Sequence, residues 1–261
     1  MKIQYVSDLH LEFSENREFI RKNPLTPVGD ILILAGDIVL FEKIECAEEF
    51  FNFCSSNFNE TYWIAGNHEY YHGNLEGRTG QFIENIRSNV HLVNNYWIQK
   101  DNTRIIFSTL WTSISPENAW HIQNGLNDYH VIKDGDKRFS TFRSNELFQE
   151  NLAFIQEAVT KNELEKCIVV THHVPTFMNY PEEYKGSVLN QAFAVELFDF
   201  IEQSTIDYWI YGHHHRNIET FNIGNTTLVT NQLGYVMSNE HKDFKRNNTI
   251  ELMINENLYN K

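Results

Sequence analysis

The sequence contains few cysteines and no long apolar run. Among its 261 residues only three are cysteine, namely Cys46, Cys54 and Cys167. A small, odd number of cysteines argues against a disulfide framework, and none of the three has the spacing of a metal site. No apolar segment approaches the roughly 20 residues that span a bilayer, and no charged and apolar leader precedes the strand-like start. We therefore expect a soluble, cytoplasmic protein that does not bind membranes.

Basic residues are also scarce. The 21 lysines and arginines are outnumbered by 35 aspartates and glutamates, which gives a formal net charge of −14 at pH 7. Proteins that bind duplex nucleic acid usually carry a basic patch, because the neutralisation of phosphates drives their affinity. No long run of lysine or arginine occurs in this chain, so we do not expect a nucleic-acid partner. Bound divalent cations would offset part of the negative charge locally.

Apolar residues are plentiful enough for a sizeable core. Hydrophobic residues make up 41% of the chain and aromatic residues 14%, which argues against disorder. The length allows one large or two small domains, but no repeat and no low-complexity linker divides the sequence. We therefore predict a single domain over residues 1–261. The pattern loosens around residues 111–145, where we expect a cap or rim insertion.

Short β-branched and aromatic runs alternate with amphipathic segments along the chain. Such alternation, with antiparallel strands added at its end, predicts two packed sheets with helices outside. The pairs Asn94-Asn95 and Gly224-Asn225 are candidate turns between strands. The expected helices are 42–58, 75–88, 144–159 and 192–202. The expected strands are 3–6, 31–35, 61–65, 90–93, 96–99, 104–110, 167–171, 208–211, 218–223, 226–230 and 249–254.

Five short clusters of metal-ligating side-chain types each follow an apolar run directly. Loops that leave the carboxyl ends of parallel strands converge at one edge of a sheet. Five separate loops can therefore deliver aspartate, histidine and asparagine to a single point, which predicts a two-metal hydrolytic site. The clusters are Asp8-Leu9-His10, Gly36-Asp37, Gly66-Asn67-His68-Glu69, Thr171-His172-His173 and Gly212-His213-His214-His215.

Each cluster alone has an ordinary structural explanation. Asp8 could cap a helix, Gly36-Asp37 could form a turn, and Asn67-His68 could open a helix with Glu69 near its positive end. Five such clusters, all at strand ends, are hard to attribute to turns. Imidazole and carboxylate ligands suit Mn, Fe, Zn or Co, and the absence of cysteine from the set argues against a structural zinc site.

Together these motifs resemble the calcineurin-like metallophosphoesterases. The family pattern is D-x-H, G-D, G-N-H-E/D, a histidine after a strand, and G-H-x-H, and all five elements occur in order between Asp8 and His215. The resemblance implies an α/β fold, a four-layer αββα sandwich of two mixed β-sheets flanked by helices. Further stretches resemble one bacterial subgroup of the family: 109–112, 127–129, 171–175 and 232–235.

The resemblance also implies two divalent metal ions, such as Mn, Fe or Zn, with Asp37 as their shared ligand. A bridging hydroxide would then attack the phosphorus atom of a small phosphorylated substrate, either a phosphomonoester or a phosphodiester. The implied ligands of the first ion are Asp8, His10, Asp37 and His215. The implied ligands of the second ion are Asp37, Asn67, His172 and His213.

His68 is the expected general acid for the leaving group, beside the catalytic role of Asp37. The alternative for His68 is a helix-opening residue or a residue that supports a metal ligand. Glu69 could orient His68. His173 and His214 are not ligands in the family pattern, and we expect them to support the ligands by hydrogen bonds or to line the substrate cleft.

Two stretches could form a rim over the metal site. Aromatic residues in 111–129 and 175–185 would suit a nucleobase, a sugar or a phosphotyrosine ring, and simple loop packing explains them equally well. Two rival functions remain at this point. A nuclease of the same fold would want a basic groove, which the charge of −14 disfavours. A binding scaffold without activity would usually lose ligands, whereas this chain keeps every motif position.

Overall fold

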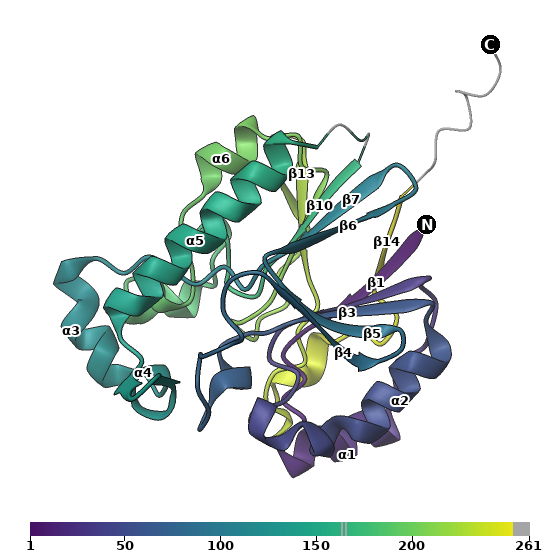
Figure 1. Ribbon diagram of the computed structural model, residues 1–261, viewed down its shortest axis with the longest axis horizontal. Coiled ribbons are helices and arrows are strands. Elements are labelled where there is room, and N and C mark those ends of the chain that lie inside the picture. Colours follow the sequence, from purple (N-terminus) through teal and green to yellow (C-terminus); the bar gives the residue numbers. More distant parts are fainter. Residues whose placement is uncertain (163, 165, 253–261) are drawn as a thin grey trace.

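The computed structural model describes residues 1–162, 164 and 166–252, and two six-stranded β-sheets packed face to face form its centre (Figure 1). The first sheet has the strand order β14-β1-β2-β3-β5-β4. Its four central strands run parallel, and the edge strands β14 and β4 run antiparallel to them. The strands are β1 (Lys2–Val6), β2 (Ile31–Ala35), β3 (Glu60–Ile64), β4 (Phe82–Arg87), β5 (Val90–Asn94) and β14 (Thr249–Glu251).

The second sheet repeats this plan with the order β12-β13-β11-β10-β7-β6. Its central strands are parallel, and β12 and β6 are the antiparallel edges. The strands are β6 (Tyr96–Lys100), β7 (Thr103–Phe107), β10 (Lys166–Val170), β11 (Tyr208–Tyr211), β12 (Phe221–Ile223) and β13 (Thr226–Thr230). A separate short pair consists of β8 (Lys133–Asp134) and β9 (Lys137–Arg138).

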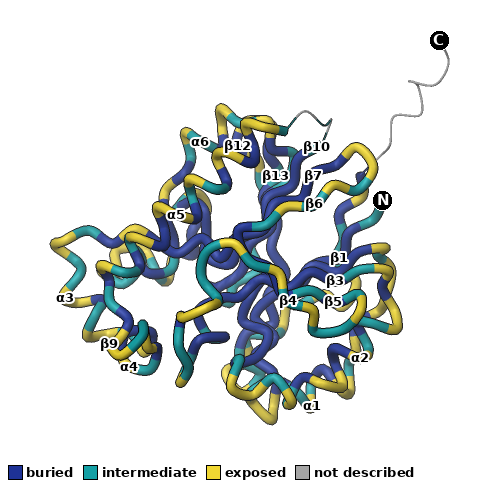
Figure 2. Tube along the Cα trace, viewed as in Figure 1, coloured by how far each residue is buried: buried dark blue, intermediate teal, exposed yellow. Residues whose placement is uncertain are grey.

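Helices cover the outer face of each sheet, so the sheets are buried on both sides (Figure 2). Helices α1 and α2 pack on the first sheet, and α5 and α6 on the second. This burial explains why the parallel strands are mainly apolar. The α-helices are α1 (Ser14–Lys22), α2 (Glu48–Asn57), α3 (Pro116–Gly125), α4 (Asp128–Val131), α5 (Thr141–Thr160) and α6 (Phe198–Gln203). The 3₁₀ turns are η1 (Phe41–Ala47), η2 (His68–Tyr70), η3 (Glu182–Tyr184), η4 (Val188–Ala192), η5 (Val236–Ser238) and η6 (Glu240–Asp243).

The predicted αββα sandwich is therefore confirmed, with two corrections among its elements. The helix expected over 75–88 is wrong, because this segment holds strand β4 after a turn in which Gly77 and Gly80 adopt φ angles of 78° and 72°. The helix expected over 192–202 begins only at Phe198, because Val195 and Leu197 donate backbone hydrogen bonds to the 174–175 segment instead.

Other boundaries differ by less. Helix α1 lies in a polar stretch for which no element was expected, and only the part of 42–58 from residue 48 onward is α-helical. The strand expected over 218–223 covers only 221–223, and the one expected over 249–254 covers 249–251, while residues 253 and 254 lie outside the described part. Within the described residues, no helix combines the length and the apolar character needed to cross a membrane.

Candidate metal centre

All five predicted clusters lie at the edge where the parallel strands of the two sheets end. They follow strands β1, β2, β3, β10 and β11, and the loops bond to one another just beyond the strands. The backbone nitrogen of His10 donates to the carbonyl of Asp37 at 2.9 Å, and that of Gly212 donates to the carbonyl of His172 at 2.9 Å. The first of these bonds joins two loops that follow strands of the first sheet, and the second joins two loops that follow strands of the second sheet. The clusters are thus held in place by the strands that precede them.

Five of the candidate ligands have a left-handed backbone conformation. This conformation costs an ordinary residue about 1–3 kcal/mol, although aspartate and histidine adopt it more often than most. It turns the chain sharply at the strand end and directs the side chain back over the sheet edge. The φ angles are 55° at Asp8, 47° at His10, 54° at Asp37, 83° at His213 and 52° at His215.

The glycines of the motifs leave room for the ligands. A β-carbon at Gly36 would lie 2.2 Å from the Nδ1 atom of His172, and one at Gly66 would lie 2.2 Å from the Oδ1 atom of Asp37. No side chain fits at such distances without displacing a ligand. Gly36 also has a φ angle of 88°, which favours glycine.

A first group of ligand atoms comes from Asp8, His10, Asp37 and His215. The Nε2 atoms of His10 and His215 are 2.9 Å apart. The Oδ1 atom of Asp8 lies 3.5 Å from the Nε2 atom of His215, and the Oδ2 atom of Asp37 lies 3.8 Å from the Nε2 atom of His10. Four ligand atoms of the types that bind divalent ions thus surround one point.

The partners of these two histidines fix which ring nitrogen carries the proton. The Nδ1–H of His10 donates to the Oε1 atom of Glu12 at 3.2 Å, and the Nδ1–H of His215 donates to the Oε2 atom of Glu240 at 2.7 Å. Each neutral ring therefore presents a lone pair at Nε2. Two lone pairs 2.9 Å apart repel each other unless a proton or a cation lies between them.

A second group has the same character and comes from Asp37, His172 and His213, with Asn67 beside them. The Nε2 atom of His172 lies 3.0 Å from Nδ1 of His213, 3.2 Å from Oδ1 of Asn67 and 3.4 Å from Oδ1 of Asp37. The Nδ1–H of His172 donates to the carbonyl of Ala35 at 3.0 Å, which again leaves a lone pair at Nε2.

Asp128 fixes the amide of Asn67. The Nδ2 atom of Asn67 donates to the Oδ1 atom of Asp128 at 3.0 Å, so that the amide oxygen faces His172. The hydroxyl of Tyr71 donates to the same carboxylate oxygen at 2.6 Å. Burial raises the pKa of Asp128, and both hydrogen bonds act against this rise. In the second group, the facing atoms of Asp37, Asn67 and His172 are therefore all hydrogen-bond acceptors, and Nδ1 of His213 lies beside them.

The shifted pKa values of the ligand residues also indicate that the site favours positive charge. Burial alone would lower the pKa of His215, but hydrogen bonds to Asp8 and Glu240 outweigh it and raise this pKa to about 10. Burial also opposes the charge on His172, yet Asp37 raises the pKa of its ring to about 9. Burial would raise the pKa of Asp37, whereas His172 and His68 hold it well below its usual range. The residues therefore fit divalent cations, which would supply this charge without protonating the ligands.

His68 lies next to both groups and points along the cavity wall. Its Nδ1 atom is 3.3 Å from Glu12, its Nε2 atom is 3.2 Å from the hydroxyl of Tyr235, and its ring stacks on Tyr71 with centroids 4.1 Å apart. Its backbone nitrogen donates to Oδ1 of Asp37 at 2.9 Å. Burial alone would lower the pKa of His68, but Asp37 and Glu12 outweigh it and raise this pKa.

Glu69 does not contact His68, contrary to the suggestion from their adjacency. Its buried carboxylate instead accepts hydrogen bonds from two ligand-bearing loops. Burial raises the pKa of Glu69 to about 8, while backbone donors favour its carboxylate form. Glu12 occupies the position beside His68 that sequence reasoning gave to Glu69. The donors to Glu69 are the backbone nitrogens of Asp37, Ile38 and Gly66 and the indole nitrogen of Trp63.

The two remaining histidines of the motifs have different surroundings. His173 is buried against Trp111, with ring centroids 5.2 Å apart, and burial together with His172 lowers its pKa to about 3. His214 lines the cavity, and its Nδ1 atom accepts from Nε2 of Gln232 at 3.0 Å. Burial lowers the pKa of His214 to about 4. Both rings are therefore neutral near pH 7.

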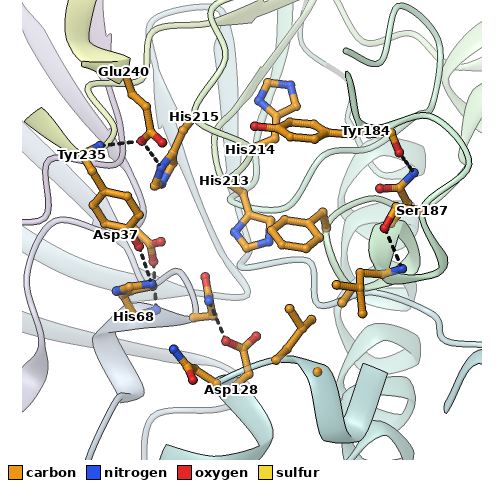
Figure 3. A pocket seen from close by; sticks show the side chains of 18 of the residues that line it. Asp37, His68, Asp128, Tyr184, Ser187, His213, His214, His215, Tyr235 and Glu240 are labelled. Atoms are coloured by element: carbon orange, nitrogen blue, oxygen red, sulfur yellow. Dashed lines mark hydrogen bonds and ion pairs between the residues drawn. The ribbon is translucent and has the colours of Figure 1, made fainter. Parts of the chain in front are cut away.

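A cavity of about 520 Å³ opens beside the candidate ligands (Figure 3). His68, Tyr235 and Glu240 line one part of it. Residues of the segments 125–128 and 180–193 line another part, and the ligand-bearing loops complete the wall. Parts of both stretches that were expected to form a rim thus lie at the cavity, although Trp111 itself is buried beneath it.

Sequence reasoning missed the carboxylates that support the ligands. Glu12 had a local signal, because it follows His10 by two residues, and Asp128 lies within the 127–129 stretch already noted. Gln232 lies in the 232–235 stretch, and its side chain accepts a hydrogen bond from the backbone nitrogen of His215 at 2.7 Å. Glu240 lies 25 residues beyond its partner and had no local signal.

Comparisons with known proteins identify similar sequences and similar folds. The sequence model described as calcineurin-like phosphoesterase matches residues 1–217. An uncharacterised protein of Acanthamoeba polyphaga mimivirus is 33% identical over 270 residues, which cover 93% of each chain. The crystal structure of a phosphopantetheinyl hydrolase from Mycobacterium tuberculosis is similar in fold, with a TM-score of 0.69, 14% identity and 95% of each chain covered. A dimetal phosphatase from Danio rerio gives a TM-score of 0.48 at 11% identity, over 89% of this chain and 87% of that one.

Proposed function

The chain belongs to the calcineurin-like phosphoesterase family, and on that premise we propose that it hydrolyses a phosphate ester with the help of two divalent metal ions. Membership of the family implies a phosphoester hydrolase. One observation supports the metal-dependent reaction above the others. Two buried groups of ligand atoms share Asp37, and in each of them two lone pairs face each other at about hydrogen-bonding distance, on Nε2 of His10 and His215 in the first and on Nε2 of His172 and Oδ1 of Asn67 in the second.

The ligand assignment follows these two groups. Carboxylate, amide and imidazole ligands together suit Mn, Fe or Zn. When bound, two such ions lower the pKa of a water molecule and withdraw charge from the phosphoryl oxygens, so no side chain needs to become phosphorylated. We assign Asp8, His10 and His215 to the first ion, Asn67, His172 and His213 to the second, and Asp37 to both.

His68 is the proposed proton donor to the leaving oxygen. Its Nδ1–H bond to Glu12 leaves the Nε2 atom on the side of the cavity, next to the hydroxyl of Tyr235. A positively charged imidazole in this position can protonate an alkoxide as it leaves. Asp37 raises the pKa of His68 and also accepts its backbone N–H, so the acid and the metal ligand are held at a fixed separation.

The Asp37→Ala variant tests the proposal directly. We expect wild-type protein to contain metal and to hydrolyse p-nitrophenyl phosphate or its bis ester, and the variant to lose most of its metal and its turnover. Elemental analysis and absorbance of p-nitrophenol measure both. Full activity of the variant would refute the assignment of Asp37. Near-zero metal in the wild type, with no turnover after manganese is added, would instead favour a binding scaffold.

A screen of phosphate release then identifies the substrate. Nucleotides, sugar phosphates, phosphopeptides and lipid phosphates belong in it, each with several metals. A phosphopantetheinyl ester belongs there too, because the M. tuberculosis protein of similar fold is a phosphopantetheinyl hydrolase. A nuclease finds less support, since none of the described residues that line the cavity is lysine or arginine.

A further inference from the structure

The two ends of the cavity differ in charge. The end at Asp37 would receive the metal ions and hence the phosphoryl group. The far wall is built from α3–α4 and the 180–193 segment, and most of its side chains are uncharged. Among the described residues that line the cavity, none is lysine or arginine. A substrate with a second anionic group would therefore find no unpaired lysine or arginine in the described lining, because the nearby Arg216 is already bound to Glu183.

The carboxylates in the lining are already engaged. Asp128 accepts from Asn67 and Tyr71, as described above. Glu240 accepts from His215 and from the backbone nitrogen of Tyr235. Glu183 accepts from the Nε atom of Arg216 at 2.8 Å. Each of these three carboxylates therefore already has a donor from the protein, which weakens its attraction for an ammonium group of a substrate.

Aromatic faces make up much of the remaining wall. Tyr184 lies with the guanidinium of Arg216 5.6 Å from its ring centroid, and Phe193 packs on His213 with centroids 4.8 Å apart. Tyr180 is buried and packs on Phe177. Rings held in this way form a rigid apolar surface, which suits a flat or apolar group of the substrate.

We propose that the substrate carries a single phosphoryl group, bound at the metal end, on an uncharged alcohol with a ring or another apolar body. This inference rests on the proposed phosphoesterase function. A cavity of about 520 Å³ has the size of a small-molecule site. An anionic group on the alcohol would lose its hydration in the cavity without gaining a partner, and this penalty selects against such esters. Nucleoside diphosphates and nucleic acids are excluded for the same reason.

Matched phenyl phosphates test this selectivity. Esters with para hydroxymethyl, carboxymethyl and aminomethyl substituents have similar size, and the methylene group keeps the leaving oxygens similar. We expect kcat/KM for the carboxymethyl ester to be lower than for the hydroxymethyl ester by about tenfold or more. The aminomethyl ester should show no comparable increase in kcat/KM over the hydroxymethyl ester. Equal values for the neutral and anionic esters would overturn the inference while leaving the proposed function intact.

A charge reversal within η3 locates the effect. Glu183 lines the cavity, whereas the adjacent Glu182 does not and its side chain is 85% exposed, paired with Lys185. Glu183→Lys would place a cation beside the cavity and free Arg216. We expect it to raise the ratio of kcat/KM for the carboxymethyl ester over the hydroxymethyl ester about tenfold, and Glu182→Lys to leave it within about twofold. Equal shifts in both variants would mean that net charge, not the cavity, sets the preference, and would overturn the inference.

A binding measurement separates this inference from the reaction itself. Benzylphosphonates with the same three substituents cannot be hydrolysed, and calorimetry on manganese-loaded protein gives their affinities. Absence of turnover on every ester would refute the proposed function. Tighter binding of the neutral phosphonate than of the anionic one, by a similar factor, would still support the charge selectivity of the cavity, and equal binding would refute it.

Discussion

Two variants of Glu240 should weaken metal binding by different amounts. The Oε2 atom of this carboxylate accepts hydrogen bonds from Nδ1 of His215 and from the backbone nitrogen of Tyr235, both at 2.7 Å. In Glu240→Gln the amide oxygen can occupy the same position and accept both bonds, so that only the negative charge is lost. In Glu240→Ala both bonds are lost, and the His215 ring is free to rotate or to change tautomer.

The size of the effect follows from these contacts. Groups that support a metal-bound histidine are typically worth about 10- to 100-fold in metal affinity, or roughly 1.4–2.7 kcal/mol. Because glutamine keeps the position of the ring, we expect a loss near the lower figure. Alanine removes position and charge together, so its loss should approach the upper figure.

Competition with a metal-binding indicator dye measures these affinities for zinc or manganese. Glu219→Gln is the matched control, because Glu219 is exposed and only four residues beyond His215 in the chain. Thermal unfolding of the metal-free proteins checks that each variant folds. Metal affinity of Glu240→Ala within about twofold of wild type would refute the role of Glu240, and an equal loss in both variants would assign the whole effect to charge.

Two further predictions concern the acid and the packing of the ligands. His68→Ala should keep its metal but lose turnover most severely for esters with poor leaving groups. A series of aryl and alkyl phosphates should therefore show a steeper dependence of turnover on leaving-group pKa in the variant than in the wild type. Equal losses of turnover across the series would contradict the acid role. Gly66→Ala should reduce metal content measured by elemental analysis, because its β-carbon would lie 2.2 Å from Oδ1 of Asp37; unchanged content would show that the loop can move aside.

The convergence of the five clusters could be predicted from the sequence because each cluster follows its strand directly. The apolar run before Asp8 and the one before Asp37 each predict a buried parallel strand, and strand ends meet at one edge. The supporting residues needed contacts across the chain instead. Glu240 contacts His215 from η6, and no periodic pattern in the sequence predicts this turn.

The wrong helix over 75–88 and the shortened helix over 192–202 show where local patterns fail. Phe82 and Ile86 are four residues apart, which fits one face of a helix but also one face of a strand. In the structure they are partly buried against the first sheet's core, while Ile83 between them is 50% exposed, as alternation in β4 requires. In the 192–197 segment, the bridge between Val174 and Ala194 replaces the expected helical hydrogen bonds. In both segments pairing with another stretch of the chain determines the structure, because β4 pairs with the next strand β5, and Ala194 pairs with Val174.

Part of the negative charge of the chain is buried around the candidate metal centre. Several carboxylates counted in the net charge of −14 are buried around the site, among them Asp8, Glu12, Asp37 and Asp128. Two divalent ions would add four positive charges to this region, so the surface is less acidic than the sequence total indicates. Net charge alone is therefore weak ground for excluding polyanionic substrates. The stronger ground is the far wall of the cavity, where the described side chains offer rings and amides to a substrate but no lysine or arginine.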